Sequence, residues 1–190
     1  MQFPVRLSVR LKGFAYSQPS TYFLTVCTHD KRWIFGEVIG HEVALSRCGK
    51  IVSECWRSIP AHFPNVELAA HVVMPNHVHG VIIVKQRART DRANEKSDAR
   101  EPRRIGALPP GSIPAIVRSF KSVTTRRIHE AASRPHDVWQ RGYYERIIRD
   151  DDEFRQICEY IRLNPANWAS DDENSATTSE ARSKCRFVGA

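Results

Sequence analysis

Hydrophobic and polar positions follow two different periods along the chain, and together they predict four strands and three helices. Alternating polarity, or a run of aromatic and β-branched residues, predicts strands at residues 22–28, 66–74, 77–85 and 143–149. Apolar residues at helical spacing predict helices at residues 41–59, 112–132 and 150–164. The order β-α-β-β-α-β-α predicts an α+β fold of the ferredoxin-like, split βαβ type with one extra helix. We therefore expect a four-stranded antiparallel sheet with helices on one face, plus a C-terminal helix.

The second and third predicted strands should form a hairpin. Apolar residues occupy every second position of the second strand, which predicts one apolar face, at Val66, Leu68, Ala70, Val72 and Met74. Pro75-Asn76 then leads directly into the strand at 77–85, and so short a connection predicts a tight turn. The third strand would be an inner strand of the sheet.

Two helices have recognisable ends. Ser112 is a candidate N-cap with Pro114 in the first turn, and the buried side of this helix is predicted at Ile113, Ile116, Val117, Phe120 and Ile128. Acidic residues 150–153 suit the start of the last helix and its dipole, and Asn164-Pro165 should end it.

We expect one domain over residues 1–168. Residues 86–111 lack large apolar side chains almost entirely, which predicts a mobile insert. Residues 169–190 are polar and are predicted to form a disordered tail.

The composition favours a polyanionic partner. The formal net charge is +8 and the pI is about 9.5, which suits nucleic acid. Residues 85–104 hold eight Lys/Arg against four Asp/Glu, so half of this charge lies there. The five cysteines show no C-x-x-C spacing, which predicts reduced thiols. No run approaches the ~18 apolar residues of a membrane span, and the first residues lack the apolar core of a signal peptide. We expect a cytoplasmic, nucleoid-associated protein without a membrane partner.

His77-Val78-His79 is the strongest chemical signal in the chain. Side chains two apart on a strand share a face, so both imidazoles should point to one place at the edge of the turn. Two histidines in this arrangement predict two ligands of a metal ion.

The last helix offers partners for the histidines. Phe154, Ile157, Cys158 and Ile161 form its apolar stripe, and Tyr160 and Asn164, four residues apart, lie at the stripe's edge. If this helix docks beside the hairpin, His77, His79 and Asn164 could hold a divalent ion. Tyr160 could then attack a phosphodiester and form a covalent ester.

These residues resemble a known family. Met74-Pro75-Asn76-His77-Val78-His79 is similar to the HUH motif of the single-tyrosine transposases. Their REP-associated branch has a C-terminal signature similar to Trp139-Gln140, Tyr143–Arg149 and Tyr160–Pro165. The resemblance covers roughly residues 5–168, without the insert.

The resemblance implies an HUH endonuclease that uses Mg²⁺ or Mn²⁺ and acts on single-stranded DNA bearing hairpins, of the REP or insertion-sequence-end type. It implies His77 and His79 as metal ligands, Tyr160 as the nucleophile that forms a 5′-phosphotyrosine, and Asn164 as the third ligand. Glu145 and Arg146 would support the active site. Many relatives have a histidine where this chain has Arg146, and this difference leaves the efficiency of cleavage open.

Other residues are predicted to contact DNA. Cationic side chains could bind phosphates, namely Arg118, Lys121, Arg126, Arg127 and Arg149. Trp139, Tyr143 and Tyr144 could stack on unpaired bases, although burial in the core is the alternative for Trp139. Tyr143 and Tyr144 also compete with Tyr160 as nucleophiles, and on a strand only one of these two can face the histidines.

Two other functions fit the same residues. A domesticated relative could bind hairpin DNA or RNA without cutting it, which the departure at Arg146 favours. A metal-dependent hydrolase could use water and form no adduct. The protein could be a monomer or a homodimer, and in a dimer Tyr160 could reach the partner's histidines.

Overall fold

The computed structural model describes residues 20–85, 108–132, 137–171 and 173–174. Most of the predicted insert and residues 175–190 of the predicted tail lie outside this range. Residues 108–111 lead into a helix, and residues 168–170 form a short 3-10 helix.

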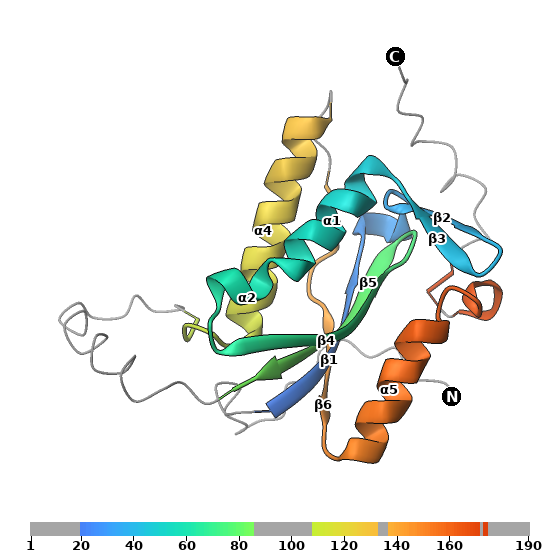
Figure 1. Cartoon of the computed structure of the whole chain (residues 1–190). Helices are drawn as coiled ribbons and strands as arrows, with labels where there is room; N and C mark the ends of the chain where they lie inside the picture. Colours follow the sequence, from blue (N-terminus) through green and yellow to red (C-terminus); the bar gives the residue numbers. More distant parts are fainter. Residues whose placement is uncertain (1–19, 86–107, 133–136, 172, 175–190) are drawn as a thin grey trace.

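A four-stranded antiparallel sheet forms the centre of the protein (Figure 1). Its strands are β1 (Ser20–Cys27), β4 (Val66–Val73), β5 (His77–Val84) and β6 (Tyr144–Ile148). The order across the sheet is β4-β5-β1-β6, all neighbours being antiparallel. This is the strand order of the split βαβ layout, so the predicted fold class is confirmed. β5, which carries the histidines, is an inner strand as expected.

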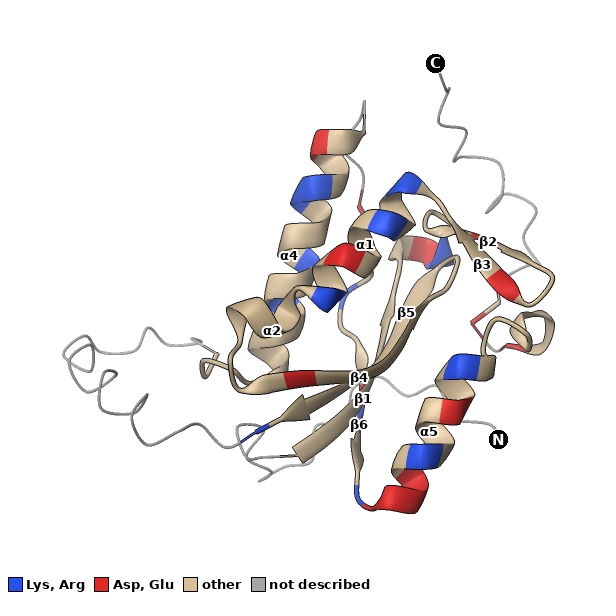
Figure 2. Cartoon of the chain, viewed as in Figure 1, with Lys and Arg blue, Asp and Glu red and all other residues tan. Residues whose placement is uncertain are grey.

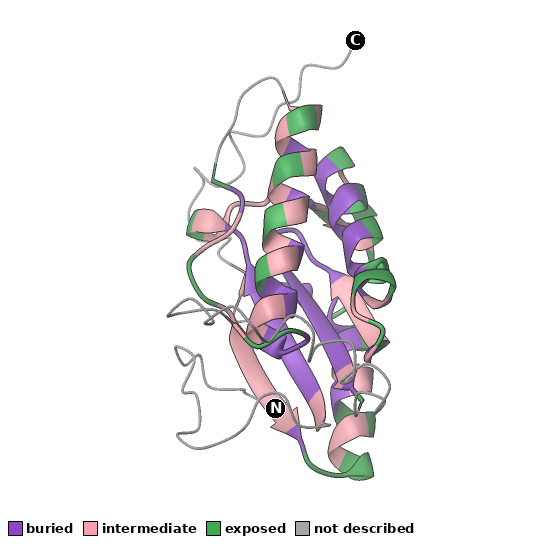
Figure 3. Cartoon of the chain, turned by 90° about the vertical axis from the view of Figure 1, so that its left-hand side faces the viewer, coloured by how far each residue is buried: buried purple, intermediate pink, exposed green. Residues whose placement is uncertain are grey.

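Helices cover both faces of the sheet (Figure 1). One face packs against α1 (Arg47–Arg57), the short α2 (Ile59–His62) and α4 (Ile113–Ala131), and its core includes Trp56, Ile116 and Phe120. The other face packs against α5 (Asp151–Leu163), around Phe23, Val81, Ile148, Ile157 and Ile161. Figure 3 shows the outer side of α4 exposed or half-buried in front of buried strands. In the described ranges no helix is long and apolar enough to cross a membrane.

The helix predicted at 41–59 is wrong in its first part. Its first residues belong to β3 (Glu42–Leu45), which forms a hairpin with the preceding β2 (Gly36–Ile39). Helix α1 starts only after Ser46. Val43 and Leu45 are half-buried while their neighbours are exposed, which is a strand period rather than a helical one. The Ser46 hydroxyl accepts the Gly49 N–H at 3.1 Å and caps the helix.

The predicted alternation along β4 is also wrong beyond its middle. The pairing with β5 shifts register between Leu68 and His71, where the strand bulges. Leu68 therefore packs towards α1 and α4, but Ala70 and Val72 pack towards α5. The bulge moves the later side chains to the opposite face of the sheet.

The predicted ends of α4 and α5 are confirmed. Ser112 is the N-cap residue of α4, although its hydroxyl donates to the Pro109 carbonyl at 2.7 Å instead of accepting a helix N–H. The five apolar residues predicted on the buried side of α4 are all buried. Asp150 caps α5 by accepting the Glu153 N–H at 2.8 Å, and Asn164 follows its last residue.

Gly80 is required by a close approach between β5 and α1. A Cβ atom at this position would lie 2.1 Å from Cζ2 of Trp56, which is 1 % exposed. We predict that Gly80→Ala lowers the free energy of unfolding by about 1–3 kcal/mol, because a buried ring must move. Urea denaturation measures the loss. In a Trp56→Leu background, Gly80→Ala should lower the free energy of unfolding by less than it does in the wild type. An equal loss in both backgrounds would contradict the steric explanation.

Candidate active site

His77 and His79 begin β5 and lie on its α5-facing side. Their ring centroids are 4.3 Å apart, and the two residues are 0 % and 3 % exposed. The predicted shared face is therefore confirmed. Gly80, the next residue, faces Trp56 on the other side of the sheet, so the strand separates the histidine pair from the larger core.

Each imidazole is oriented through its Nδ1 atom. His77 Nδ1 lies 2.8 Å from the Asn76 side-chain oxygen, and His79 Nδ1 lies 2.9 Å from the Thr25 hydroxyl. An amide oxygen only accepts hydrogen bonds, so Nδ1 of His77 carries the proton and its Nε2 presents a lone pair. This is how protein partners orient metal-binding histidines. Neither Asn76 nor Thr25 was predicted in this role.

Burial keeps both imidazoles neutral at neutral pH. It lowers the pKa of His79 to about 3. The pKa of His77 lies well below its ordinary value, first because of burial and then because of His79 and Lys31. Neutral imidazole is the form that binds a metal ion.

Helix α5 brings Tyr160 to the histidines. The Tyr160 hydroxyl lies 3.3 Å from His79 Nε2, and the two ring centroids are 5.3 Å apart. Phe23 packs edge-on against the Tyr160 ring at 6.1 Å and stacks on the His79 ring at 5.3 Å. Tyr160 is only half-buried. The histidine pair of β5 and the tyrosine of α5 therefore meet within one chain.

Asn164 and Asp171 complete the cluster. Asn164 is 1 % exposed, and its amide nitrogen donates to Asp171 Oδ2 at 2.6 Å. Its amide oxygen has no hydrogen-bond partner among the residues that the structure describes. One ligand atom each of His77, His79 and Asp171 lies within 4.8 Å of the others. Asp171 was not predicted, because it lies in the stretch expected to be a polar tail. An aspartate seven residues beyond Asn164 was the only local signal.

This donor set fits a divalent cation. Within the described ranges, His77 Nε2 and the Asn164 oxygen are buried without a hydrogen-bond partner, and leaving such groups unpaired costs about 1–3 kcal/mol each. A cation bound by two imidazoles and a carboxylate would satisfy them. Imidazole and carboxylate ligands together suit Mn²⁺ well, and Mg²⁺ with retained waters.

The structure separates the two competing tyrosines. Tyr144 pairs with Thr25 across the sheet and packs edge-on against Phe23 at 6.2 Å, on the histidine face. Tyr143 packs against the core on the other face.

Glu145 and Arg146 also lie on opposite faces. Glu145 pairs with Leu24, whose side chain lies in the core beneath α1 and α4, so it faces away from Tyr160. Arg146 pairs with Phe23, and its guanidinium contacts Glu153 Oε1 of α5 at 2.5 Å. Arg146 therefore links β6 to the helix that carries Tyr160.

The predicted DNA contacts on α4 belong to the helix that packs on the face of the sheet opposite α5 and the histidines. Figure 2 shows basic residues along α4. Arg127 pairs with Glu54 at 2.7 Å, and Lys121 donates to the carbonyls of Gln140, at 2.9 Å, and Gly142. Trp139 packs against Phe35 and Phe120 and donates to the Thr124 hydroxyl at 2.9 Å. Arg118 and Arg149 are exposed.

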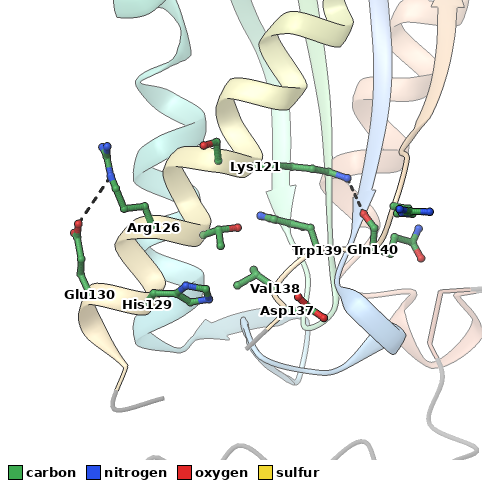
Figure 4. A pocket seen from close by; sticks show the side chains of 11 residues that line it. Lys121, Arg126, His129, Glu130, Asp137, Val138, Trp139 and Gln140 are labelled. Atoms are coloured by element: carbon green, nitrogen blue, oxygen red, sulfur yellow. Dashed lines mark hydrogen bonds and ion pairs between the residues drawn. The ribbon is translucent and has the colours of Figure 1, made fainter. Parts of the chain in front are cut away.

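A groove of about 800 Å³ runs between α4 and residues 137–141 (Figure 4). Its lining includes Lys121, Arg126, His129 and Arg141. Burial lowers the pKa of Lys121 to about 8. Arg126 is exposed and lies 3.9 Å from Glu130.

Comparison with known proteins bears on the fold. No family model matches the chain. A solved structure of a REP-associated tyrosine transposase bound to a REP hairpin aligns with a TM-score of 0.56 at 18% identity, covering 85% of this chain and 74% of that one. The chain thus shares the fold of this REP-associated tyrosine transposase, as the resemblance implied. The chain is also 38% identical over 166 residues to an uncharacterized protein of Haemophilus influenzae, covering 87% of this chain and 91% of that protein. It belongs to the same family as that protein.

Proposed function

We propose that the protein is a metal-dependent, single-stranded DNA transposase that cleaves and rejoins hairpin-bearing DNA through a covalent 5′-phosphotyrosine. The observation that carries this proposal is the 3.3 Å approach of the Tyr160 hydroxyl to His79, beside a cluster of two buried histidines, His77 and His79, and the half-buried Asp171. A phenol beside a dication site is the arrangement that nucleophilic attack on a phosphodiester requires.

His77, His79 and Asp171 would hold the ion, with the Asn164 oxygen beside them. A bound Mg²⁺ or Mn²⁺ would polarise the scissile phosphodiester and offset its charge. Asn76 and Thr25 orient the two imidazoles, and Phe23 keeps the Tyr160 ring against them. The site is therefore organised before the substrate arrives.

The covalent step exchanges one ester for another. The Tyr160 oxygen bonds to phosphorus while the bond from phosphorus to the 3′ oxygen breaks. The phenol proton passes to a neighbouring base or water, and the departing 3′ oxygen takes up a proton. A 3′-hydroxyl of the same or another strand then reverses the step and joins the ends. The ester conserves the bond energy, so transposition and recombination by this route need no nucleotide cofactor.

One chain would suffice for this chemistry. Tyr160 reaches His79 of the same chain, which supports a site formed in cis. Hairpin DNA of the REP or insertion-sequence-end type is the proposed partner, and the cytoplasm, at the nucleoid, is the proposed location.

The groove along α4 is the proposed contact for the phosphates of the hairpin. We predict that Arg126→Gln with Arg141→Gln weakens hairpin binding uniformly across sequences. Each lost phosphate contact lowers the slope of log affinity against log salt by about one, so the slope should fall by about two. Fluorescence anisotropy at several salt concentrations measures this. Arg57 is an exposed arginine of α1, and Arg57→Gln is the matched control. An equal loss of affinity in that control would show that the groove is not a specific contact for the DNA.

A hairpin-binding protein without cleavage is the second candidate. Arg146 favours it, because its guanidinium pairs with Glu153 and supplies no additional imidazole near the site. Incubation with Mn²⁺ and a labelled single-stranded hairpin, followed by a denaturing gel, separates the candidates. A covalent protein–DNA band supports the transposase, binding without cleavage supports the binding protein, and cleavage without an adduct supports a hydrolase.

A further inference from the structure

The segment that follows α5 folds back over the histidine pair. The Trp168 ring lies 6.0 Å from the His77 ring and 5.5 Å from Trp33. The Asn174 amide donates to the Trp168 carbonyl at 2.8 Å. Asp171 lies between these two residues in the sequence and contributes its carboxylate to the cluster. The position of Asp171 therefore depends on what holds this returning segment.

Glu173 is the main connection between that segment and the rest of the protein. Its carboxylate accepts from Lys31 Nζ and from the Cys27 thiol at 3.2 Å, and its carbonyl accepts from the Asn76 amide at 2.7 Å. Its own N–H donates to Asp171 Oδ1 at 2.7 Å. Glu173 thus links Asp171 directly to the end of β1 and to the residue that orients His77.

The Lys31 side of this link has an unusual backbone conformation. Asp30 and Lys31 both adopt left-handed backbone, with φ of 54° and 53°, which non-glycine residues rarely do. The Lys31 carbonyl also accepts from the Asn76 amide at 3.3 Å. The Glu173 side chain is only 14% exposed, so its charge is paired with Lys31 largely away from water, and the pair is screened less than a surface pair.

We propose that the Lys31–Glu173 ion pair is a positioning latch that holds Asp171 as the third metal ligand. This inference rests on the proposed metal site and assigns roles to two residues that touch neither ion nor substrate. Without the latch, the returning segment must be ordered when the ion binds, and that entropy cost weakens binding. Partners of metal ligands typically contribute 10–100-fold to affinity.

The test is a Mn²⁺ titration of the full-length chain without DNA, with free Mn²⁺ followed by electron paramagnetic resonance. Lys31→Met and Glu173→Gln should each raise the dissociation constant about tenfold or more, and the double variant no further. The reversed pair, Lys31→Glu with Glu173→Lys, should recover most of the affinity and also guards against loss by misfolding. Glu67→Gln and Lys85→Met, which break a surface ion pair at the other end of β5, should change nothing.

Two results would overturn the latch and can be told apart. If His77→Gln removes Mn²⁺ binding while Lys31→Met and Glu173→Gln retain wild-type affinity, the latch is refuted and the metal site stands. If the wild-type chain does not bind Mn²⁺ at all, the metal site of the proposed function fails, and the latch fails with it.

Discussion

Replacing Tyr160 by phenylalanine should abolish the covalent protein–DNA adduct and leave the fold intact. The phenyl ring can keep its edge-on contact with Phe23, while the hydroxyl beside His79 is lost. Removing the nucleophile of a covalent mechanism typically lowers the rate by about 10⁴–10⁶. The measurement is adduct formation on a denaturing gel with Mn²⁺ and a labelled hairpin, together with thermal unfolding and Mn²⁺ titration, which should both stay at wild-type values.

Two neighbouring tyrosines provide matched controls. Tyr144 also packs on Phe23 but belongs to β6, and Tyr143 lies on the other face of the sheet. Tyr144→Phe and Tyr143→Phe should therefore retain the adduct. An adduct that persists in Tyr160→Phe and disappears in Tyr144→Phe would show that the nucleophile is Tyr144 of β6 and not Tyr160 of α5.

His77→Gln or His79→Gln should remove Mn²⁺ binding, with an affinity loss of more than about a hundredfold, because each change deletes a direct ligand and not merely a partner of one. Glutamine preserves much of the buried volume and so limits the effect on packing. Adduct formation should fall in parallel, since the phosphodiester would no longer be polarised.

His71→Gln is the control for these two changes. His71 lies on β4 and stacks on Trp56 at 6.3 Å, on the opposite face of the sheet. The His71→Gln variant should bind Mn²⁺ and form the adduct as the wild type does. Wild-type Mn²⁺ affinity in both His77→Gln and His79→Gln would show that the cluster does not hold the ion.

The sequence predicted those parts of the fold whose signals are local. The hairpin of β4 and β5, the start of α4 at Ser112 and the acidic start of α5 all follow from neighbouring residues. The bulge in β4 was not predictable in this way, because it depends on the partner strand. The β2–β3 hairpin was missed because Val43 and Leu45 were grouped with the apolar helical stripe of residues 51–59 that follows them.

The candidate site shows the same difference between residues with local signals and residues whose roles depend on distant contacts. His77, His79, Tyr160 and Asn164 were predicted from spacing within single elements and from the resemblance, and the structure brings them together. Asp171 and Glu173 were not predicted, since a run of acidic and amide residues after a helix is usually solvated. Their roles arise only from hydrogen bonds to distant residues such as Lys31 and Asn76.

The most direct test of the proposed chemistry is a peptide map of the adduct that the wild-type chain forms with a hairpin oligonucleotide and Mn²⁺. Trypsin separates Tyr160, in peptide 156–162, from Tyr143 and Tyr144, in peptide 142–146. Mass spectrometry after nuclease trimming should find a 5′-phosphonucleotide on peptide 156–162. A nucleotide on peptide 142–146, or cleaved DNA with no modified peptide, would contradict Tyr160 as the nucleophile.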